Sequence, residues 1–370
     1  MSSPSATPDY FPALDGLRLV CCVFVIAGHG MVGHPLAPAF GQLGPMGVNV
    51  FFALSGFLIT TLLLRERSRR GSISLRSFYV RRILRIFPVY YVAVAAALLG
   101  IVLGGDRYLR PFGMTRAELD LPLVAASHLT FLANWVSVKL PTTLDVLWSV
   151  SIEEQFYLVF PAAILLSRTN RGAMGAIAAG LACCWITRGW LVVMDPAAVY
   201  RNTLAHGDHL LLGALAATLT QTWPETLNRI LRRLGRMSVD AVALALIVLL
   251  AIVESRAPLF GGLLFIDYLV SAALCALLVA VAATNTSWLS RLLARPTARF
   301  LGQLTYAGYV FHIYCVAIAW FVMARITDDI GIAAPARTAL AIPLTFAVAW
   351  VSRLTLEKRA MMLKTRFERT

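Results

Sequence analysis

Long apolar runs recur along the chain, and short polar segments separate them. A helix needs about 20 mainly apolar residues to cross the hydrocarbon core of a bilayer, and the runs have about this length. The pattern therefore predicts an all-α, polytopic membrane protein with about ten transmembrane helices. The predicted spans are residues 14–32, 47–64, 86–103, 148–166, 173–194, 205–219, 239–253, 263–283, 301–324 and 338–351.

The composition agrees with a membrane protein rather than a soluble one with a large core. Of the 370 residues, 59% are hydrophobic and 14% are charged, whereas soluble domains average about 25% charged residues. The net charge of +14 does not predict nucleic-acid binding, because the basic residues lie in short segments between apolar runs. All six cysteines lie within apolar runs, and their spacing indicates neither a disulfide framework nor a metal site.

The distribution of basic residues predicts the orientation. The apolar segment 121–138 contains Pro122, His128 and Asn134, which favours a re-entrant or interfacial segment over a span. If it does not cross, 23 of the 33 Lys and Arg lie on the inner side and eight on the outer side. If it crosses, the split becomes 13 inside and 18 outside. The positive-inside rule selects the first arrangement, with both termini cytoplasmic.

The first predicted span carries two ionisable residues, Arg18 near its inner end and His29 near its outer end. Eleven residues make about three helical turns, so both side chains share a face, about 16 Å apart along the axis. Ionisable groups within a span usually face a bundle interior or a wet cavity and suggest a functional site. The alternative is a snorkelling arginine and a packed histidine.

The span 148–166 begins with a polar face. Ser149, Glu153 and Tyr157 follow one another at i,i+4 spacing and share one side of a helix, whereas Glu154 is turned about 100° away. The topology places Glu153 at the depth of His29, and a histidine–carboxylate pair is the usual form of a general base held in one tautomer. We therefore expect Glu153 to orient His29. The alternative is a purely structural ion pair.

Arg82 and Arg85 are i,i+3 neighbours at the predicted inner face. Two guanidinium groups side by side suit phosphate, which arginine binds in a bidentate manner. Topology-setting charge is the alternative for this pair.

Further polar residues lie near the predicted outer face or within the spans. Asn49 is expected in the outer layer with His29, and the nearby Ser55 and Gly56 suit close helix packing. His206, Asp208 and His209 are expected to be interfacial, without the additional ligands that a metal site needs. His312, near the middle of the span 301–324, either lines a cavity or is a satisfied bundle histidine.

Four of these strings together resemble the membrane-bound acyltransferase-3 family, which includes O-acetyltransferases of O-antigen, exopolysaccharide, Nod factors and macrolides. The similarity covers about residues 10–355. The strings are LDGLR at 14–18 with His29, GVNVFFALSGFL at 47–58, RRILRIFP at 81–88 and WSVSIEEQFY at 148–157.

The resemblance implies ten core helices, an acyl-CoA donor and an essential histidine at His29. It further implies that Arg18, the pair Arg82 and Arg85, and Glu153 match residues of family motifs. Two positions depart from the pattern: Asn49 stands where many relatives have Asp, and His206 stands where Arg often precedes the aspartate that matches Asp208.

We therefore expect a multi-pass inner-membrane O-acyltransferase. It would transfer an acyl group, expected to be acetyl, from cytoplasmic acyl-CoA to a hydroxyl of a glycan or a glycosylated small molecule. No bound cofactor, metal or nucleic acid is expected. The predicted catalytic residues are His29 and Glu153, and the predicted substrate-binding residues are Arg18, Arg82, Arg85, Asn49, Ser149, Tyr157 and Asp208.

The predicted domain organisation is simple. Residues 14–352 form one transmembrane domain between a cytoplasmic tail at 1–13 and a basic cytoplasmic tail at 353–370. The rival hypothesis is a transporter or export partner in which His29, Glu153 and Asp208 form a proton relay. The absence of an inverted repeat and of paired interrupted helices in the sequence disfavours it.

Overall fold

The structure is a computed structural model, and it describes residues 10–110, 113–136, 140–256, 264–284, 287–360 and 362. Within these residues every regular element is a helix and none is a strand, which confirms the all-α prediction. The long helices are α1 (Pro12–Gly30), α3 (Leu43–Arg70), α4 (Leu75–Gly104), α8 (Trp148–Leu166), α9 (Asn170–Met194), α11 (Asp208–Thr222), α12 (Pro224–Arg256), α13 (Leu264–Ala283), α16 (Thr305–Met323) and α17 (Ile330–Ser352).

Short helices connect the long ones. The α-helical connectors are α2 (Ala37–Gly41), α5 (Asp106–Leu109), α6 (Leu121–Leu129), α7 (Thr142–Asp145), α10 (Thr203–His206), α14 (Trp288–Leu293) and α15 (Pro296–Gln303). The 3₁₀ turns are η2 (Arg116–Glu118), η3 (Ala133–Trp135) and η4 (Pro196–Arg201), and a π-helical turn, η5 (Arg353–Glu357), follows α17.

Eight helices of the described part are long and apolar enough to cross a membrane. They correspond to eight of the ten predicted spans, so the chain is a multi-pass membrane protein. The other two predicted spans fall in α11, whose 15 residues rise about 22 Å, and in the apolar part of α12 at Val239–Val253. The count of ten therefore stays a prediction.

The helix boundaries differ from the apolar runs where polar residues continue a helix. Helix α3 runs on to Arg70 and ends at Gly71, which adopts the left-handed conformation with φ 72°. Helix α4 begins at Leu75, because the Ser74 side chain accepts a hydrogen bond from the Ser77 backbone N–H. Arg82 and Arg85 are therefore helical, as their assumed i,i+3 relation requires.

Two further segments bear on the predicted topology. Of the segment 121–138, the structure describes residues up to 136. There helix α6 ends at Leu129 after nine residues, a rise of about 13 Å, so the described part forms no continuous span. The predicted span 301–324 is interrupted at Leu304: its first residues belong to α15, and the rest form α16.

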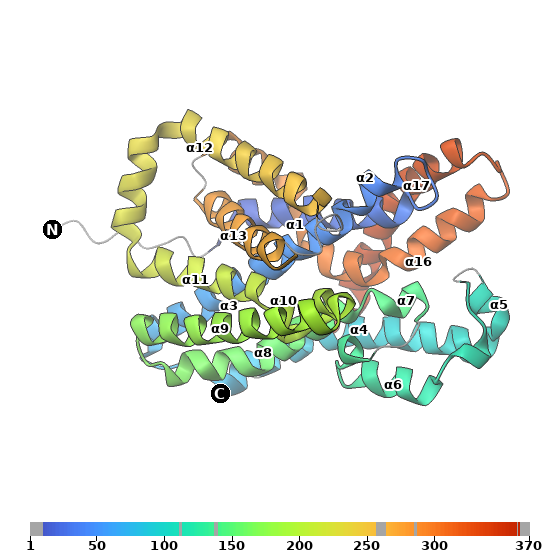
Figure 1. Ribbon diagram of the computed structural model, residues 1–370, viewed down its shortest axis with the longest axis horizontal. Coiled ribbons are helices and arrows are strands. Elements are labelled where there is room, and N and C mark those ends of the chain that lie inside the picture. The colour runs from blue at the N-terminus through green and yellow to red at the C-terminus, as the bar shows by residue number, and fades with distance from the viewer. Residues whose placement is uncertain are drawn as a thin grey trace.

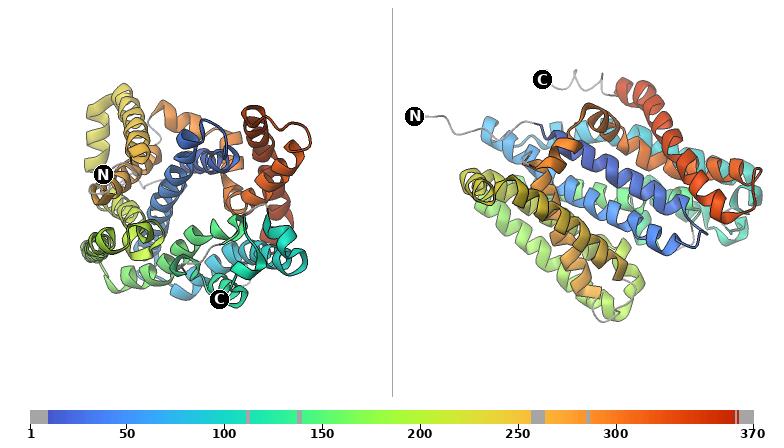
Figure 2. Two further views of the ribbon diagram at one scale, coloured as in Figure 1. Left: turned by 45° about the vertical axis from the view of Figure 1, so that its right-hand side comes forward. Right: turned by 90° about the horizontal axis from the view of Figure 1, so that it is seen from above.

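Helices α1 and α3 lie in the middle of the bundle (Figure 1). In that view α12 and α13 lie at the upper left, α16 and α17 at the right, and α8 and α9 at the lower left, and the turned views in Figure 2 keep α1 and α3 between these groups. Helix α3 packs tightly against α11, because Gly56 and Gly213 let the backbones meet. A Cβ atom at Gly56 would lie 1.8 Å from the carbonyl oxygen of Leu210.

The described chain ends meet at one end of the bundle. The Gln303 amide contacts the Tyr10 hydroxyl at 3.5 Å and its oxygen accepts from Arg353 at 3.2 Å. The prediction that both termini are cytoplasmic stays a prediction. Residues 1–9 of the predicted N-terminal tail, and 361 and 363–370 of the predicted C-terminal tail, lie outside the described residues.

Candidate active site

A cavity of about 280 Å³ lies where α1 begins, α3 ends and α4 passes. We call it the basic cavity, because four arginines line it: Arg18, Arg65, Arg82 and Arg85. The end of the bundle that holds it is called the basic end. Its remaining lining is Tyr10, Phe11, Leu14, Asp15, Ser55, Leu58, Ile59, Thr61, Leu62, Tyr157 and Gln303.

A second cavity of about 90 Å³, the central cavity, continues from the basic cavity into the bundle. Six residues line both cavities: Arg18, Ser55, Arg82, Arg85, Tyr157 and Gln303. The central cavity extends past Glu153 to Ser149 and Tyr309. The two cavities therefore form one path from the basic end toward the middle of the bundle.

Two of the four arginines of this path, Arg82 and Arg85, carry charges that no carboxylate neutralises by direct contact within the described residues. The Arg82 guanidinium lies over the Tyr157 ring at 5.1 Å and over the Phe78 ring at 5.6 Å. Arg18 lies 3.6 Å from Asp15, one turn earlier on α1. The net positive charge of the path suits an anionic ligand.

The predicted polar face of α8 lines the central cavity as a unit. Ser149, Glu153 and Tyr157 all belong to its lining, which confirms that the three share a side. The Glu153 carboxylate accepts hydrogen bonds from the Ser55 hydroxyl at 2.7 Å and from the Tyr157 hydroxyl at 3.4 Å. Ser55 therefore donates a hydrogen bond to Glu153 in addition to being small enough for close helix packing. Gly56 has the expected packing role.

The expected pair of His29 with Glu153 is wrong as a contact. The polar contacts of the half-buried His29 ring go to the Val25 carbonyl and to His312, and those of Glu153 go to Ser55 and Tyr157. Helix periodicity predicts the face of each residue, but neither its depth nor the rotation of α8 relative to α1. Glu153 lines the central cavity together with Arg18, about three turns of α1 away from His29, and faces Ser55 of α3.

His29 is instead paired with His312 of α16. His29 Nδ1 lies 2.9 Å from the Val25 carbonyl oxygen and 3.3 Å from His312 Nε2. His312 Nδ1 lies 2.5 Å from the Tyr309 carbonyl oxygen. Since a carbonyl only accepts, Nδ1 carries the proton in both rings, and Nε2 of each neutral ring bears a lone pair. His29 Nδ1–H thus points to two acceptors, and His29 Nε2 is left as the basic atom.

Tyr309 joins this histidine pair to the central cavity. Its hydroxyl lies 2.6 Å from the Ser149 hydroxyl at the cavity lining, and it donates to the Val146 carbonyl at 3.1 Å. Its ring centroid lies 5.5 Å from that of His312. The path from the basic end therefore reaches the Ser149–Tyr309 hydroxyl pair, and the Tyr309 ring lies between this end of the path and His312.

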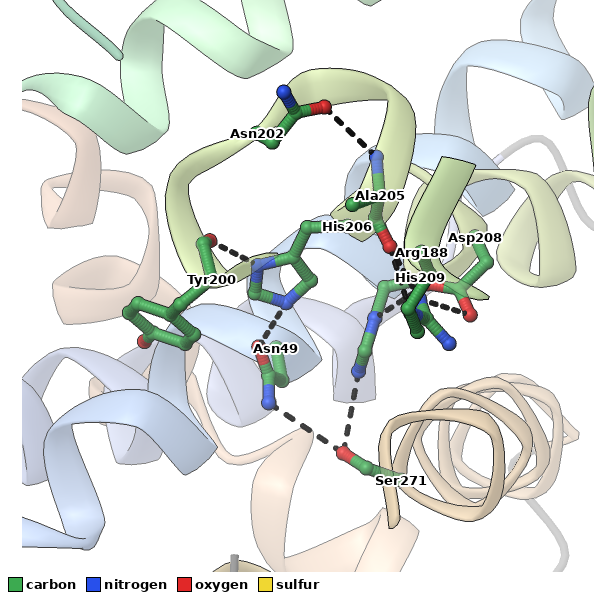
Figure 3. A network of polar contacts seen from close by, with 9 residues as sticks. All are labelled: Asn49, Arg188, Tyr200, Asn202, Ala205, His206, Asp208, His209 and Ser271. Carbon is green, nitrogen blue, oxygen red and sulfur yellow. Dashed lines mark hydrogen bonds and ion pairs between the residues drawn. The ribbon is translucent and has the colours of Figure 1, made fainter. Parts of the chain in front are cut away.

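The remaining predicted residues, Asn49 and Asp208, lie in a separate buried network (Figure 3). Asn49 contacts His206 at 2.8 Å instead of His29. Asp208 forms an ion pair with Arg188 at 2.6 Å, and its other oxygen contacts His209 at 3.1 Å. His206 and His209 are fully buried within the bundle, and the expectation that they lie at the membrane interface stays a prediction.

Sequence reasoning did not identify several residues of the path. Arg65, Gln303, Tyr306 and Tyr309 were not singled out, and His312 was left open between two roles. The sequence does contain a pattern that points to two of them: Thr305, Tyr309 and His312 recur at i,i+4 and i,i+7 spacing, on one side of an apolar helix.

No group of three or more His, Cys, Asp or Glu in the described part of the chain is placed to hold a metal ion.

These observations define a class: a multi-pass helical membrane protein in which an arginine-lined path reaches Tyr309, beside a pair of histidines from two helices. The chain belongs to the acyltransferase-3 family, whose acyltransferase domain matches residues 11–354. The family resemblance seen in the sequence is thus confirmed.

Several curated proteins are similar to the chain. It is 29% identical over 361 residues to the peptidoglycan O-acetyltransferase OatA of Listeria monocytogenes, covering 93% of this chain and 54% of that protein. It is 29% identical over 334 residues to the putative peptidoglycan O-acetyltransferase YrhL of Bacillus subtilis, covering 84% and 49%. It is 28% identical over 331 residues to a putative O-acetyltransferase of Staphylococcus aureus, covering 83% and 51%.

The chain spans about half the length of the curated relatives it matches. No solved structure matches it.

Proposed function

We propose that the protein transfers an acetyl group from cytoplasmic acetyl-CoA to a hydroxyl of a glycan on the other side of the inner membrane. The observation that carries this proposal is the continuous basic and central cavity. It has four arginines at one end and reaches Tyr309, whose ring lies beside His312 of the His29–His312 pair, at the other. The names of the relatives, which specify O-acetyl transfer and peptidoglycan, support the acetyl group and the glycan class.

The donor site follows from charge and shape. The phosphates of acetyl-CoA would bind Arg82 and Arg85, since charge-assisted hydrogen bonds from arginine to phosphate are strong and directional. The narrower central cavity would then receive the thioester arm, with Arg18 and Tyr157 along its wall. The thioester would end near the Ser149 and Tyr309 hydroxyls, which lie at the lining of the central cavity.

His29 would act as the general base. Its Nε2 accepts the proton of the acceptor hydroxyl while the hydroxyl oxygen bonds to the thioester carbonyl carbon. The tetrahedral intermediate then expels the CoA sulfur, which takes the proton back from the His29 imidazolium. The lone pair on His312 Nε2 faces His29 Nδ1–H and stabilises the positive charge while it exists.

The proton-relay hypothesis receives less support. His29, Glu153 and Asp208 belong to three separate groups of hydrogen bonds in the described part of the chain. A relay needs a continuous chain of donors and acceptors between them.

Detergent-purified protein, acetyl-CoA labelled in the acetyl group and soluble peptidoglycan fragments test the proposal. We expect label on the glycan as an alkali-sensitive ester. Arg82→Ala with Arg85→Ala should weaken acetyl-CoA binding by roughly tenfold or more, because each charge-assisted hydrogen bond contributes about 1.5–3 kcal/mol. Unchanged acetyl-CoA affinity in the double variant would refute the donor site, and absence of labelled ester would refute the acyl transfer.

A further inference from the structure

A third cavity lies at the other end of α3, away from the arginines. It has a volume of about 150 Å³ and lies between α3, η4, α12 and α13. We call it the tyrosine cavity. Its lining residues are Gln42, Pro45, Asn49, Tyr200, Val253, Asp267, Tyr268 and Ser271.

The tyrosine cavity is separate from the donor path but close to the helix end that carries His29. Asn49 and Arg65 are 16 residues apart on α3, which is about 24 Å along the axis. The helix start that contributes Gln42 and Pro45 packs against the last turn of α1: a Cβ at Gly28 would lie 3.2 Å from the Gly44 nitrogen. The cavity thus lies at the end of the bundle where the acceptor has to arrive.

The lining has the chemistry of a carbohydrate site. It combines two tyrosines with one carboxylate, two amides and one serine hydroxyl, and this lining includes no cation. Sugar rings present apolar C–H faces that lie on aromatic rings and hydroxyls that bond to carboxylates and amides. Small-ligand pockets in general combine aromatic surface with a few fixed polar groups. A phosphate-bearing ligand is disfavoured here by the Asp267 carboxylate.

A buried network holds the polar lining in place (Figure 3). The Asn49 amide lies between His206 at 2.8 Å and the Ser271 hydroxyl at 3.4 Å. His209 contacts the same hydroxyl at 3.2 Å and Asp208 at 3.1 Å. Fixed partners of this kind give the lining groups one orientation before any ligand arrives.

The same network supports the two aromatic rings. The Arg188 guanidinium, which is paired with Asp208, lies over the Tyr268 ring at 5.0 Å. His206 Nδ1 lies 2.6 Å from the Tyr200 carbonyl oxygen. Next to Tyr200, Arg201 donates two hydrogen bonds to Asp145 at 2.5 and 2.7 Å, and these bonds raise the pKa of the guanidinium. The ion pair anchors η4 to α7.

We propose that the tyrosine cavity is a saccharide subsite that binds one sugar ring of the acceptor. This rests on the proposed function, since the glycan is the acceptor class named there. The ring would lie against Tyr268 or Tyr200, and its hydroxyl or acetamido groups would bond to Asp267, Asn49 and Gln42. The cavity is smaller than the roughly 300–1,000 Å³ pockets that take drug-sized ligands, which suits a single ring.

The buried charged and polar residues around the tyrosine cavity are a physical reason to assign it a binding function. Arg188, Asp208, His206 and His209 are all fully buried within the bundle. Buried ion pairs contribute little net stability, since desolvation offsets their attraction. Ionisable groups within membrane bundles usually accompany a functional site. Support of the cavity lining accounts for this network, which the donor path and the histidine pair do not use.

Saturation-transfer NMR on the full-length protein in nanodiscs, without acetyl-CoA, tests the subsite directly. The probes are chitotetraose, cellotetraose and mannotetraose. We expect transfer to at least one of them, with affinity lowered roughly tenfold or more in Asp267→Asn and in Gln42→Ala. Asp195→Asn, an exposed carboxylate on the residue before η4, serves as the matched control and should bind like the parent.

The outcomes separate this proposal from the proposed function. Parent protein that binds none of the three saccharides, or variants that all bind as tightly as the parent, would overturn the subsite even if acetyl transfer proceeds. Loss of binding in Asp267→Asn and Gln42→Ala, with Asp195→Asn and the Arg82→Ala, Arg85→Ala protein unaffected, supports it even if acetyl-CoA proves not to be the donor. Tyr268→Phe, which keeps the ring over Arg188, should retain most of the affinity, and a complete loss would contradict ring stacking.

Discussion

His29 has two acceptors at Nδ1 and a lone pair at Nε2, which makes it a neutral base already in one tautomer. In many enzymes a carboxylate performs this orienting task, and the sequence suggested Glu153 for it. Here a backbone carbonyl and a second imidazole perform it. A neutral partner costs less to bury in a membrane bundle than a carboxylate does, because no charge leaves water.

Removing the base should abolish most of the turnover. His29→Ala should lower kcat by about 10²–10⁴-fold, the usual contribution of a general base. Acetyl-CoA binding and the amount of protein in the membrane should stay unchanged, since the donor arginines lie elsewhere. Steady-state acetyl transfer and a separate acetyl-CoA binding assay check this, and well-expressed His29→Ala protein with normal turnover would remove the proposed base.

Glu153 should act independently of His29. Glu153→Gln alters the central cavity, where the carboxylate holds Ser55 and Tyr157, so it should lower kcat/KM by itself. Because the two residues do not touch, the losses in the double variant with His29→Ala should multiply. Measurement of kcat/KM for all four proteins tests this. A double variant no worse than His29→Ala alone would mean that the two residues work as one unit after all.

His312 is a positioning residue in this account. His312→Leu should lower kcat by roughly 10- to 150-fold, the equivalent of one hydrogen bond to a charged group, and should leave the KM for acetyl-CoA unchanged. His312→Gln can present an oxygen to His29 Nδ1–H and should restore part of the loss. A purely structural role would instead lower the thermal stability of both variants equally, without this rescue.

At the scale of elements, α3 connects the three cavities. Its first turns line the tyrosine cavity, its middle lines the central cavity and its last turns line the basic cavity. Helix α11 fixes its position through the contact of Gly56 with Leu210. A shift of α3 would therefore disturb the donor path and the tyrosine cavity together.

Gly56→Ala should destabilise the bundle by about 1–3 kcal/mol, because the new methyl group would overlap the Leu210 carbonyl oxygen and the helices would have to separate. Thermal unfolding in detergent should show a lower midpoint. Gly175→Ala on α9 is the matched control, since a Cβ there meets no atom within 4 Å and alanine favours the helix. Equal midpoints for parent and Gly56→Ala would contradict the tight α3–α11 contact.

The sequence predicted the elements well and the contacts between them only in part. Apolar length located eight long helices, and i,i+4 spacing correctly placed Ser149, Glu153 and Tyr157 on one side. These features depend on local geometry. The partner of His29 depends on how α8 and α16 are rotated and shifted along α1, and His29 and His312 lie 283 positions apart in the sequence. No local pattern encodes such an arrangement.

At the scale of the whole molecule, the account needs the basic end to face the cytoplasm. In a Cys183→Ser background, which removes the exposed native thiol, Gly41→Cys should react with an impermeant thiol reagent added to intact cells. Ser72→Cys should react only after permeabilisation, because the 23-to-8 distribution of basic residues places it inside. Labelling of Ser72→Cys in sealed cells would reverse the orientation.

The most direct test of transfer across the membrane uses sealed proteoliposomes. Labelling of Gly41→Cys from outside determines which way the protein is inserted. Labelled acetyl-CoA is supplied only on the side of the basic end, and peptidoglycan fragments only on the side of His29. The account predicts labelled acetyl ester on the glycan, lost in His29→Ala and in the Arg82→Ala, Arg85→Ala protein. Ester that forms only when donor and acceptor share one compartment would contradict it.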